Sequence, residues 1–90
     1  MLSRSVTIGT PLGLHARPAA LFAQAVLESG FDVHIATADG EADAGSALEI
    51  MTLNVDGGDT VTLSIPDDSP EAARALDSLS ALLSGNLDVA

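Results

Sequence analysis

Apolar residues recur along this chain with two different periods, and the order in which the periods alternate leaves few folds open. Four stretches alternate apolar with polar residues, as half-buried strands do: residues 2–8, 31–37, 41–44 and 60–65. Three segments instead space their apolar residues as one face of a helix does: residues 17–29, 47–53 and 69–84. The predicted order of elements is therefore β-α-β-β-α-β-α.

Such an order predicts one small sheet with helices on a single face. Three helices cannot cover both faces of a four-stranded sheet, and the alternation within each strand leaves one face to water. We therefore expect an α+β fold, an open-faced β-sandwich in which three helices lie on one face of a four-stranded antiparallel sheet. The charges of residues 41–44 are typical of an edge strand. A length of 90 residues favours a single domain over residues 1–90, with one core that is mainly aliphatic.

The expected helix ends carry recognisable capping residues. Gly30 is a stop for the first helix. Ser46 and Glu49 have the spacing of a capping box, in which the serine accepts from a backbone amide and the glutamate reaches back to the serine's own amide. Ser69 is the expected N-cap of the third helix. Residues 86–90, which follow that helix, are expected to form a loose tail.

Four consecutive residues at the start of the first predicted helix carry the chemistry: His15, Ala16, Arg17 and Pro18. Unpaired backbone N–H groups and the positive end of the helix dipole meet there, and together they bind anions such as phosphate. The guanidinium of Arg17 matches phosphate oxygens, and Pro18 has no N–H to lose in a first turn. A helix start also disfavours a charged imidazolium, so His15 should keep one ring nitrogen free to attack phosphorus. We predict that His15 carries a phosphoryl group held by the backbone amides of Ala16 and Arg17.

Two stretches of the sequence resemble one known family. Residues 11–20, Pro-Leu-Gly-Leu-His-Ala-Arg-Pro-Ala-Ala, resemble the active-site segment of HPr, the histidine phosphocarrier of the bacterial phosphoenolpyruvate-dependent sugar phosphotransferase system (PTS). Residues 43–53, in which Ser46 opens a short helix, resemble the second signature of that family. The length of the chain is also that of an HPr protein, so the resemblance covers all of it.

The resemblance implies a role and partners for the predicted site. His15 would accept a phosphoryl group from phosphorylated enzyme I and pass it to enzyme IIA domains, with Arg17 stabilising the group. In the family the ring atom that carries the group is Nδ1, which the sequence alone does not identify. Such a carrier is a substrate of other enzymes rather than an enzyme, it binds no metal or organic cofactor, and it is expected to be a cytoplasmic monomer.

The resemblance also implies a docking face for both partners on the first two helices, formed by Ala20, Ala47, Leu48 and Met51. The alternative interpretation is that Leu48 and Met51 cover the core. Ser46 has two interpretations as well. In some HPr proteins the equivalent serine is phosphorylated by an ATP-dependent HPr kinase/phosphorylase, whereas here a capping role explains the residue without regulation.

Charge and composition exclude several classes of partner and site. Thirteen acidic residues against three arginines, with no lysine, give a net charge of −10, which argues against nucleic acid or an anionic membrane as partner. No run of about 20 apolar residues predicts a membrane span, and the first residues do not resemble a signal peptide. The chain has no cysteine, which excludes disulfides and thiolate metal sites. His34 is expected on the outward side of its strand, as a solvated residue rather than a metal ligand.

Other functions remain open at this point. A regulatory member of the same family, or a nitrogen- or fructose-linked paralogue, would act through protein contacts and could keep His15 and Arg17. A small-molecule-binding β-α-β domain or an acyl-phosphate hydrolase is a further alternative. The hydrolase would need an arginine and an asparagine arranged for attack by water, but Asn54 and Asn86 have no arginine near them in the sequence.

Overall fold

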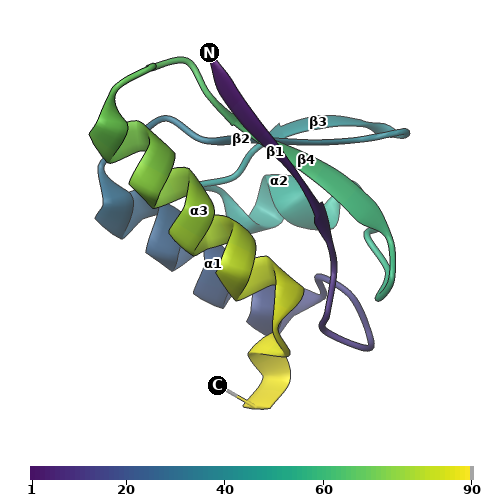
Figure 1. Ribbon diagram of the computed structural model, residues 1–90. Coiled ribbons are helices and arrows are strands. Elements are labelled where there is room, and N and C mark those ends of the chain that lie inside the picture. Colours follow the sequence, from purple (N-terminus) through teal and green to yellow (C-terminus); the bar gives the residue numbers. More distant parts are fainter. Residues whose placement is uncertain (90) are drawn as a thin grey trace.

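Residues 1–89 are described by the computed structural model, which contains the predicted elements in the predicted order (Figure 1). The strands are β1 (Leu2–Thr7), β2 (His34–Thr37), β3 (Gly40–Asp43) and β4 (Thr60–Ile65). The helices are α1 (Ala16–Ser29), α2 (Ala47–Met51) and α3 (Pro70–Ser84), and a 3₁₀ turn, η1 (Leu87–Val89), follows α3. None of these described helices has the length and apolar character needed to cross a membrane.

The four strands form one antiparallel sheet in the order β1-β4-β2-β3. The register places apolar residues opposite one another: Val6 faces Val61, and Ile35 lies between Leu63 and Ala42. All five of these side chains are buried. The charged strand β3 lies at an edge of the sheet, as its composition predicts.

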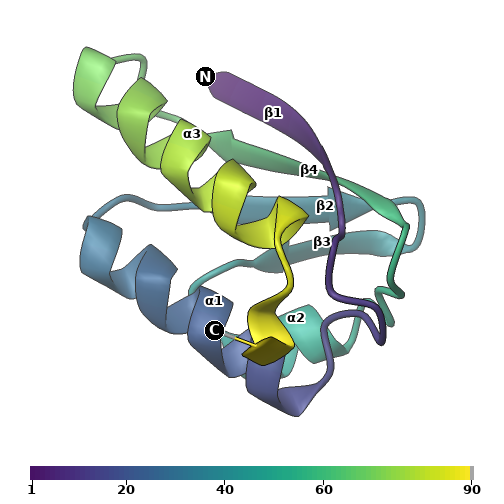
Figure 2. The same ribbon diagram turned by 60° about the horizontal axis from the view of Figure 1, so that its bottom comes forward.

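The helices cover one face of this sheet. Figure 2 shows α1 and α3 side by side along that face, and the side chains between the layers form a single cluster. The apolar stripe of α3 is buried there, as expected: Ala72, Leu76, Leu79 and Leu83. The outward positions of β1 and β4 are serines and threonines, so the opposite face is open to water. The predicted open-faced sandwich is confirmed.

Two element boundaries differ from the predicted ones by two residues or more, and others differ by a single residue. β2 begins at His34 rather than at residue 31, because the ladders with β3 and β4 begin only there. Val33 is nevertheless buried, and its carbonyl accepts a hydrogen bond from the Ala44 amide at 2.9 Å, although the residue lies outside the ladders. α2 ends at Met51 rather than near residue 53, and Asn54 follows with a positive φ of 53°, a conformation that a helix cannot continue through.

The serine caps form as predicted, with one correction. The side chains of Ser69 and Ser46 accept hydrogen bonds from the amides of Ala72 (3.1 Å) and Glu49 (3.2 Å). The Glu49 carboxylate, however, accepts from the amide of Asp43 at 3.3 Å and not from that of Ser46. The Ser46 amide instead donates to the carbonyl of Asp43 at 3.1 Å, so it was not available to a reciprocal capping box.

The expectation of a loose tail over residues 86–90 is wrong for the part that the structure describes. Leu87 is only 2 % exposed, and its amide donates to the Thr10 hydroxyl at 3.0 Å. Leu87 continues the apolar stripe of α3 four residues after Leu83, which explains why the chain turns back onto the core. Ala90 lies outside the described residues.

Residues 9–14, called the site loop below, are fixed on both sides by backbone contacts. The amide of Gly9 donates to the carbonyl of Leu83 at 3.0 Å, and the amide of Leu14 donates to the carbonyl of Val55 at 3.0 Å. Gly13 has a φ of +78°, and a Cβ at this position would overlap with the Val55 carbonyl. Only glycine satisfies both the conformation and the close approach.

Replacing Gly13 with alanine should therefore destabilise the protein more than the same change at Gly58. Gly58 has a similar φ of +88°, but no atom lies near the position of its Cβ. We expect Gly58→Ala to lower the free energy of unfolding by about 1 kcal/mol and Gly13→Ala to lower it by about 3 kcal/mol or more. Urea unfolding of both variants measures the difference. Equal losses would show that the Val55 contact contributes nothing.

Candidate functional site

His15 is the N-cap residue of α1, with an extended backbone (φ −74°, ψ −173°). The first hydrogen bond of the helix runs from the amide of Ala19 to the carbonyl of His15, at 2.9 Å. Within the described residues no partner is found for the amides of Ala16 and Arg17, and Pro18 has none to offer. The first turn of α1 therefore presents two backbone donors that have no partner among residues 1–89.

This helix start differs from the other two in its cap. Ser46 and Ser69 each accept a hydrogen bond from the first turn of their own helix, whereas His15 makes no side-chain cap. A serine or aspartate at position 15 would occupy the space in which an anion binds to the amides. The first turn of α1 also contains no acidic residue that would oppose an anion.

Arg17 is exposed in this first turn, and it differs from the other two arginines. The Arg4 guanidinium is paired with Asp77 at 2.9 Å, and Arg74 lies 3.7 Å from Glu71. Among residues 1–89, no ion pair or hydrogen bond involves the Arg17 side chain. The guanidinium is thus available to an anion bound at the helix start.

The imidazole of His15 has a contact that the sequence analysis did not predict. Its Nε2 lies 3.2 Å from Oδ2 of Asp88 in η1, and the two side chains are 44 % and 29 % exposed. Asp88 is 73 residues away along the chain, so no local pattern connects it with the site. The spacing of Leu87 after Leu83 was the one available indication that this segment folds back.

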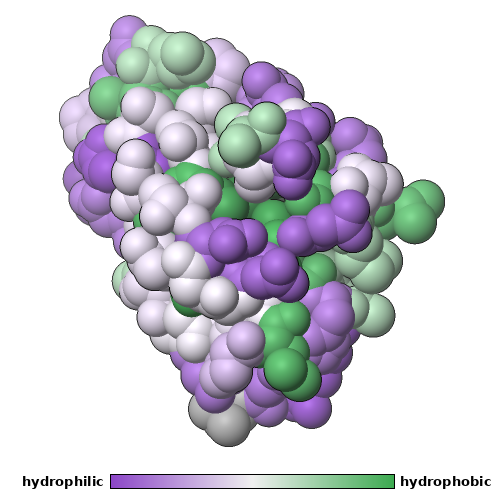
Figure 3. Space-filling model, turned by 90° about the vertical axis from the view of Figure 1, so that its right-hand side faces the viewer, coloured by the Kyte–Doolittle hydropathy of each residue, from purple (hydrophilic) through white to green (hydrophobic). Residues whose placement is uncertain are grey.

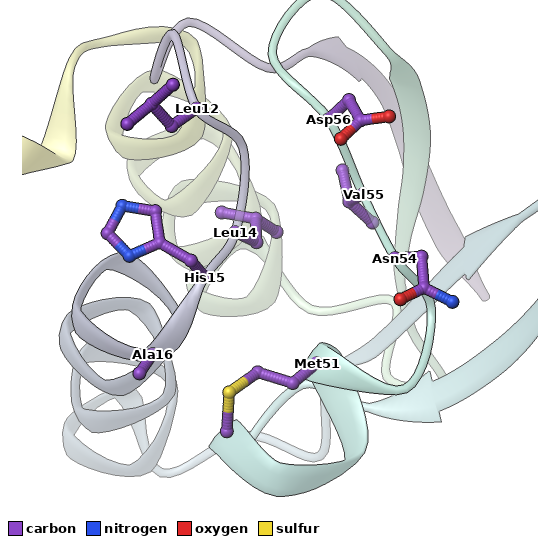
Figure 4. A pocket seen from close by; sticks show the side chains of 8 residues that line it. All are labelled: Leu12, Leu14, His15, Ala16, Met51, Asn54, Val55 and Asp56. Atoms are coloured by element: carbon purple, nitrogen blue, oxygen red, sulfur yellow. The ribbon is translucent and has the colours of Figure 1, made fainter.

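A shallow depression of about 360 Å³ lies beside His15 (Figure 4). The figure shows the start of α1 on one side, and Met51 of α2 with the chain that leads to β4 on the other. Its lining residues are Leu12, Leu14, His15, Ala16, Met51, Asn54, Val55 and Asp56. The depression is open to solvent, so the imidazole of His15 is accessible from outside the protein.

The four residues predicted to form a docking face lie on α1 and α2, which pack against each other. Leu48 is 73 % exposed and does not cover the core, and Ala20 is also exposed. Met51 and Ala47 are half-buried and pack against the core. Leu12, which the sequence analysis did not select, is 76 % exposed and lines the depression beside His15. On the face shown in Figure 3, hydrophobic side chains lie in separate patches among hydrophilic ones.

His34 lies apart from the site residues, on β2. Its ring is half-exposed, with Nε2 3.4 Å from an Asp32 oxygen and Nδ1 3.6 Å from a Glu41 oxygen. Over the described part of the chain, no group of three or more histidine, cysteine or acidic side chains is arranged to hold a metal ion.

Comparisons with known proteins agree with this site. Residues 2–85 match the family model described as "PTS HPr component phosphorylation site". The chain belongs to the HPr family. The phosphocarrier protein HPr of Streptomyces coelicolor is 38 % identical over 98 % of this chain and 94 % of its own length. The phosphocarrier protein NPr of Shewanella violacea is 41 % identical over 99 % of this chain and 96 % of its own.

A solved HPr structure confirms the fold of the family. The crystal structure of HPr from Bacillus anthracis has a TM-score of 0.81 and 30 % identity, covering 91 % of this chain and 95 % of that protein. The open-faced sandwich is therefore the HPr fold, and the family is one of PTS phosphocarriers.

The Ser46 cap gives a prediction about stability. α2 has only five residues, and the amides at its start have no partner within the helix. The hydrogen bond from the Glu49 amide to the Ser46 side chain satisfies one of them. We expect Ser46→Ala to lower the free energy of unfolding by about 1 kcal/mol, whereas Ser46→Asn, which can still cap, should stay close to the wild type. Denaturant unfolding of the two variants measures the difference, and equal losses would contradict the capping role.

Proposed function

We propose that this HPr-family protein accepts a phosphoryl group on His15 from phosphorylated enzyme I and passes it to enzyme IIA domains of the PTS. The observation that carries the proposal is the uncapped start of α1 beside the imidazole. Two amides and an arginine side chain that have no partner among residues 1–89 lie in the helix turn that begins at His15, and together with the helix dipole they favour a phosphoryl group there. Membership of the phosphocarrier family supports the same assignment.

The chemistry requires one unprotonated ring nitrogen. Its lone pair attacks phosphorus, and the bond between phosphorus and the donor breaks, with its electron pair leaving on the donor. The phosphoryl oxygens then accept hydrogen bonds from the amides of Ala16 and Arg17, while the guanidinium of Arg17 offsets the negative charge. These contacts lie at the surface, so they hold the group without preventing its transfer to the next protein.

The proposed carrier is modified and regenerated by its partners rather than turning over a substrate of its own. Both partners would dock on the face formed by Ala20, Ala47, Leu48 and Met51, which borders the depression beside His15. Methionine and leucine adapt to different partner surfaces, which suits a protein that meets two partners in turn. No residue of the proposed step calls for a metal or organic cofactor.

Of the remaining alternatives, one differs in its partners and the other in its site. A nitrogen- or fructose-linked member would use His15 and Arg17 in the same way with a different enzyme I. A regulatory member would depend on Ser46, whose hydroxyl here already accepts a bond from the Glu49 amide. A phosphate on Ser46 would also stand close to the Glu49 carboxylate, and the two negative charges would repel each other.

Incubation with phosphoenolpyruvate and catalytic amounts of the cognate enzyme I tests the proposal. We expect a gain in intact mass of one phosphoryl group that is lost in acid, as an N-linked phosphoryl group is. His15→Ala should gain nothing. His34→Ala, which removes the only other histidine, should be phosphorylated like the wild type. An unmodified wild type, or modification of His15→Ala to the same extent, would contradict the proposal.

Arg17 should contribute to the rate of transfer and not to the fold. Because its side chain is exposed and has no ion pair among the described residues, Arg17→Ala should leave the unfolding free energy unchanged. We expect the rate of phosphoryl transfer to fall by about 100-fold, and Arg17→Lys to recover only part of it because lysine lacks the planar fork. Rapid-quench kinetics with labelled phospho-enzyme I measures the rate. Arg74→Ala is the matched control, and near-normal transfer by Arg17→Ala would remove Arg17 from the mechanism.

A further inference from the structure

The last turn of the chain holds a carboxylate against the predicted phosphoryl acceptor. η1 is anchored by Leu87, whose side chain is buried and whose amide donates to Thr10 at 3.0 Å. The Thr10 side chain is fully buried. The amide of Asp88 donates to the side chain of Asn86 at 3.0 Å, which fixes the backbone that carries the carboxylate. Both contacts hold the backbone at the start of η1, and the Asp88 side chain that it carries is only 29 % exposed.

The contact between Asp88 and His15 determines which ring nitrogen is protonated. Oδ2 of Asp88 lies 3.2 Å from Nε2 of His15, within hydrogen-bond distance. An ionised carboxylate can only accept, so Nε2 must carry the proton that it donates. In a neutral imidazole this leaves the lone pair on Nδ1. A neutral ring that donates to Asp88 therefore has its free nitrogen at Nδ1.

We propose that Asp88 is a positioning residue for phosphoryl transfer: it holds His15 in the Nε2–H tautomer and orients Nδ1 toward the incoming phosphorus. This inference rests on the proposed function of His15. Asp88 lies after residues 2–85, the part of the chain that matches the family model, so the family match does not assign it this role.

The same contact stabilises the product of the step. When the Nδ1 lone pair forms the bond to phosphorus and the donor leaves with its electron pair, the ring keeps its Nε2 proton and becomes positively charged. The Asp88 carboxylate continues to accept from Nε2–H and offsets that charge, as the aspartate of a Ser-His-Asp triad does for its imidazolium. No proton has to leave the ring at any point of the step.

Three variants separate positioning from a general effect of charge. Asp88→Ala removes the carboxylate, and Asp88→Glu restores one on a longer side chain. Asp39→Ala removes a carboxylate from the exposed turn between β2 and β3 and serves as the control for net charge. Asp88 is partly exposed and on the surface, so we expect all three variants to fold.

Two readouts are needed. Long-range ¹H–¹⁵N spectra of the unphosphorylated proteins report the tautomer of the neutral His15 ring. We expect the Nε2–H form alone in the wild type and in Asp39→Ala, both tautomers in Asp88→Ala, and recovery in Asp88→Glu. The rate of phosphorylation by phospho-enzyme I should fall by about tenfold in Asp88→Ala, as when a carboxylate that orients a histidine is lost, and should rise again in Asp88→Glu.

The outcomes are distinguishable from a failure of the proposed function. An unchanged tautomer in Asp88→Ala would overturn the inference, even if the rate fell, because Asp88 would then act on the donor and not through the ring. An altered tautomer with an unchanged rate would also overturn it. If even the wild type accepted no phosphoryl group, the proposed function would fail, while the tautomer spectra would still show whether Asp88 holds the ring.

Discussion

Two hydrogen bonds hold the site loop between α3 and the segment that leads to β4. The rest of the site depends on this attachment. On one side the loop is bound to the carbonyl of Leu83, and on the other to the carbonyl of Val55. Gly13 allows the loop to lie close to the Val55 carbonyl because it adopts a positive φ and has no Cβ. Since the loop leads directly into His15, the N-cap of α1, these two contacts hold the segment from which α1 begins.

Once α1 begins there, its missing cap becomes the functional feature. Helices normally satisfy their first amides with a side chain, as Ser46 and Ser69 do for α2 and α3. α1 leaves Ala16 and Arg17 without such a partner, at a cost in stability that water at the surface keeps small. Under the proposed function, the gain would be an anion site that is already assembled at His15 before the phosphoryl group arrives.

The fold could be predicted from the sequence because it depends on local patterns of apolar and capping residues. Alternation in the strands, the stripe of α3 and the serine caps all depend on residues within a few positions of one another. The start of β2 was predicted too early because alternation reports burial and does not show where the ladders of the sheet begin. The reach of Glu49 to the Asp43 amide was missed because it depends on how the chain passes from β3 into α2.

The site was predictable only in part, for the same reason. His15, Arg17 and the amides of α1 are neighbours in sequence, and the helix start brings their chemistry together. Asp88 is 73 residues from His15, and only the packing of η1 brings it to the ring. The four-residue step from Leu83 to Leu87 indicates that η1 packs onto the core, but it does not indicate what Asp88 would touch.

The most direct measurement is a comparison of ¹H–¹⁵N backbone spectra before and after phosphorylation by phosphoenolpyruvate and enzyme I. If the start of α1 holds the phosphoryl group, the amide resonances of Ala16 and Arg17 should show the largest downfield shifts in the chain, as expected for amides that donate to a phosphoryl oxygen. Phosphorylation of His15 that left both amides unshifted, or moved the amides of α2 instead, would contradict the central role of this helix start.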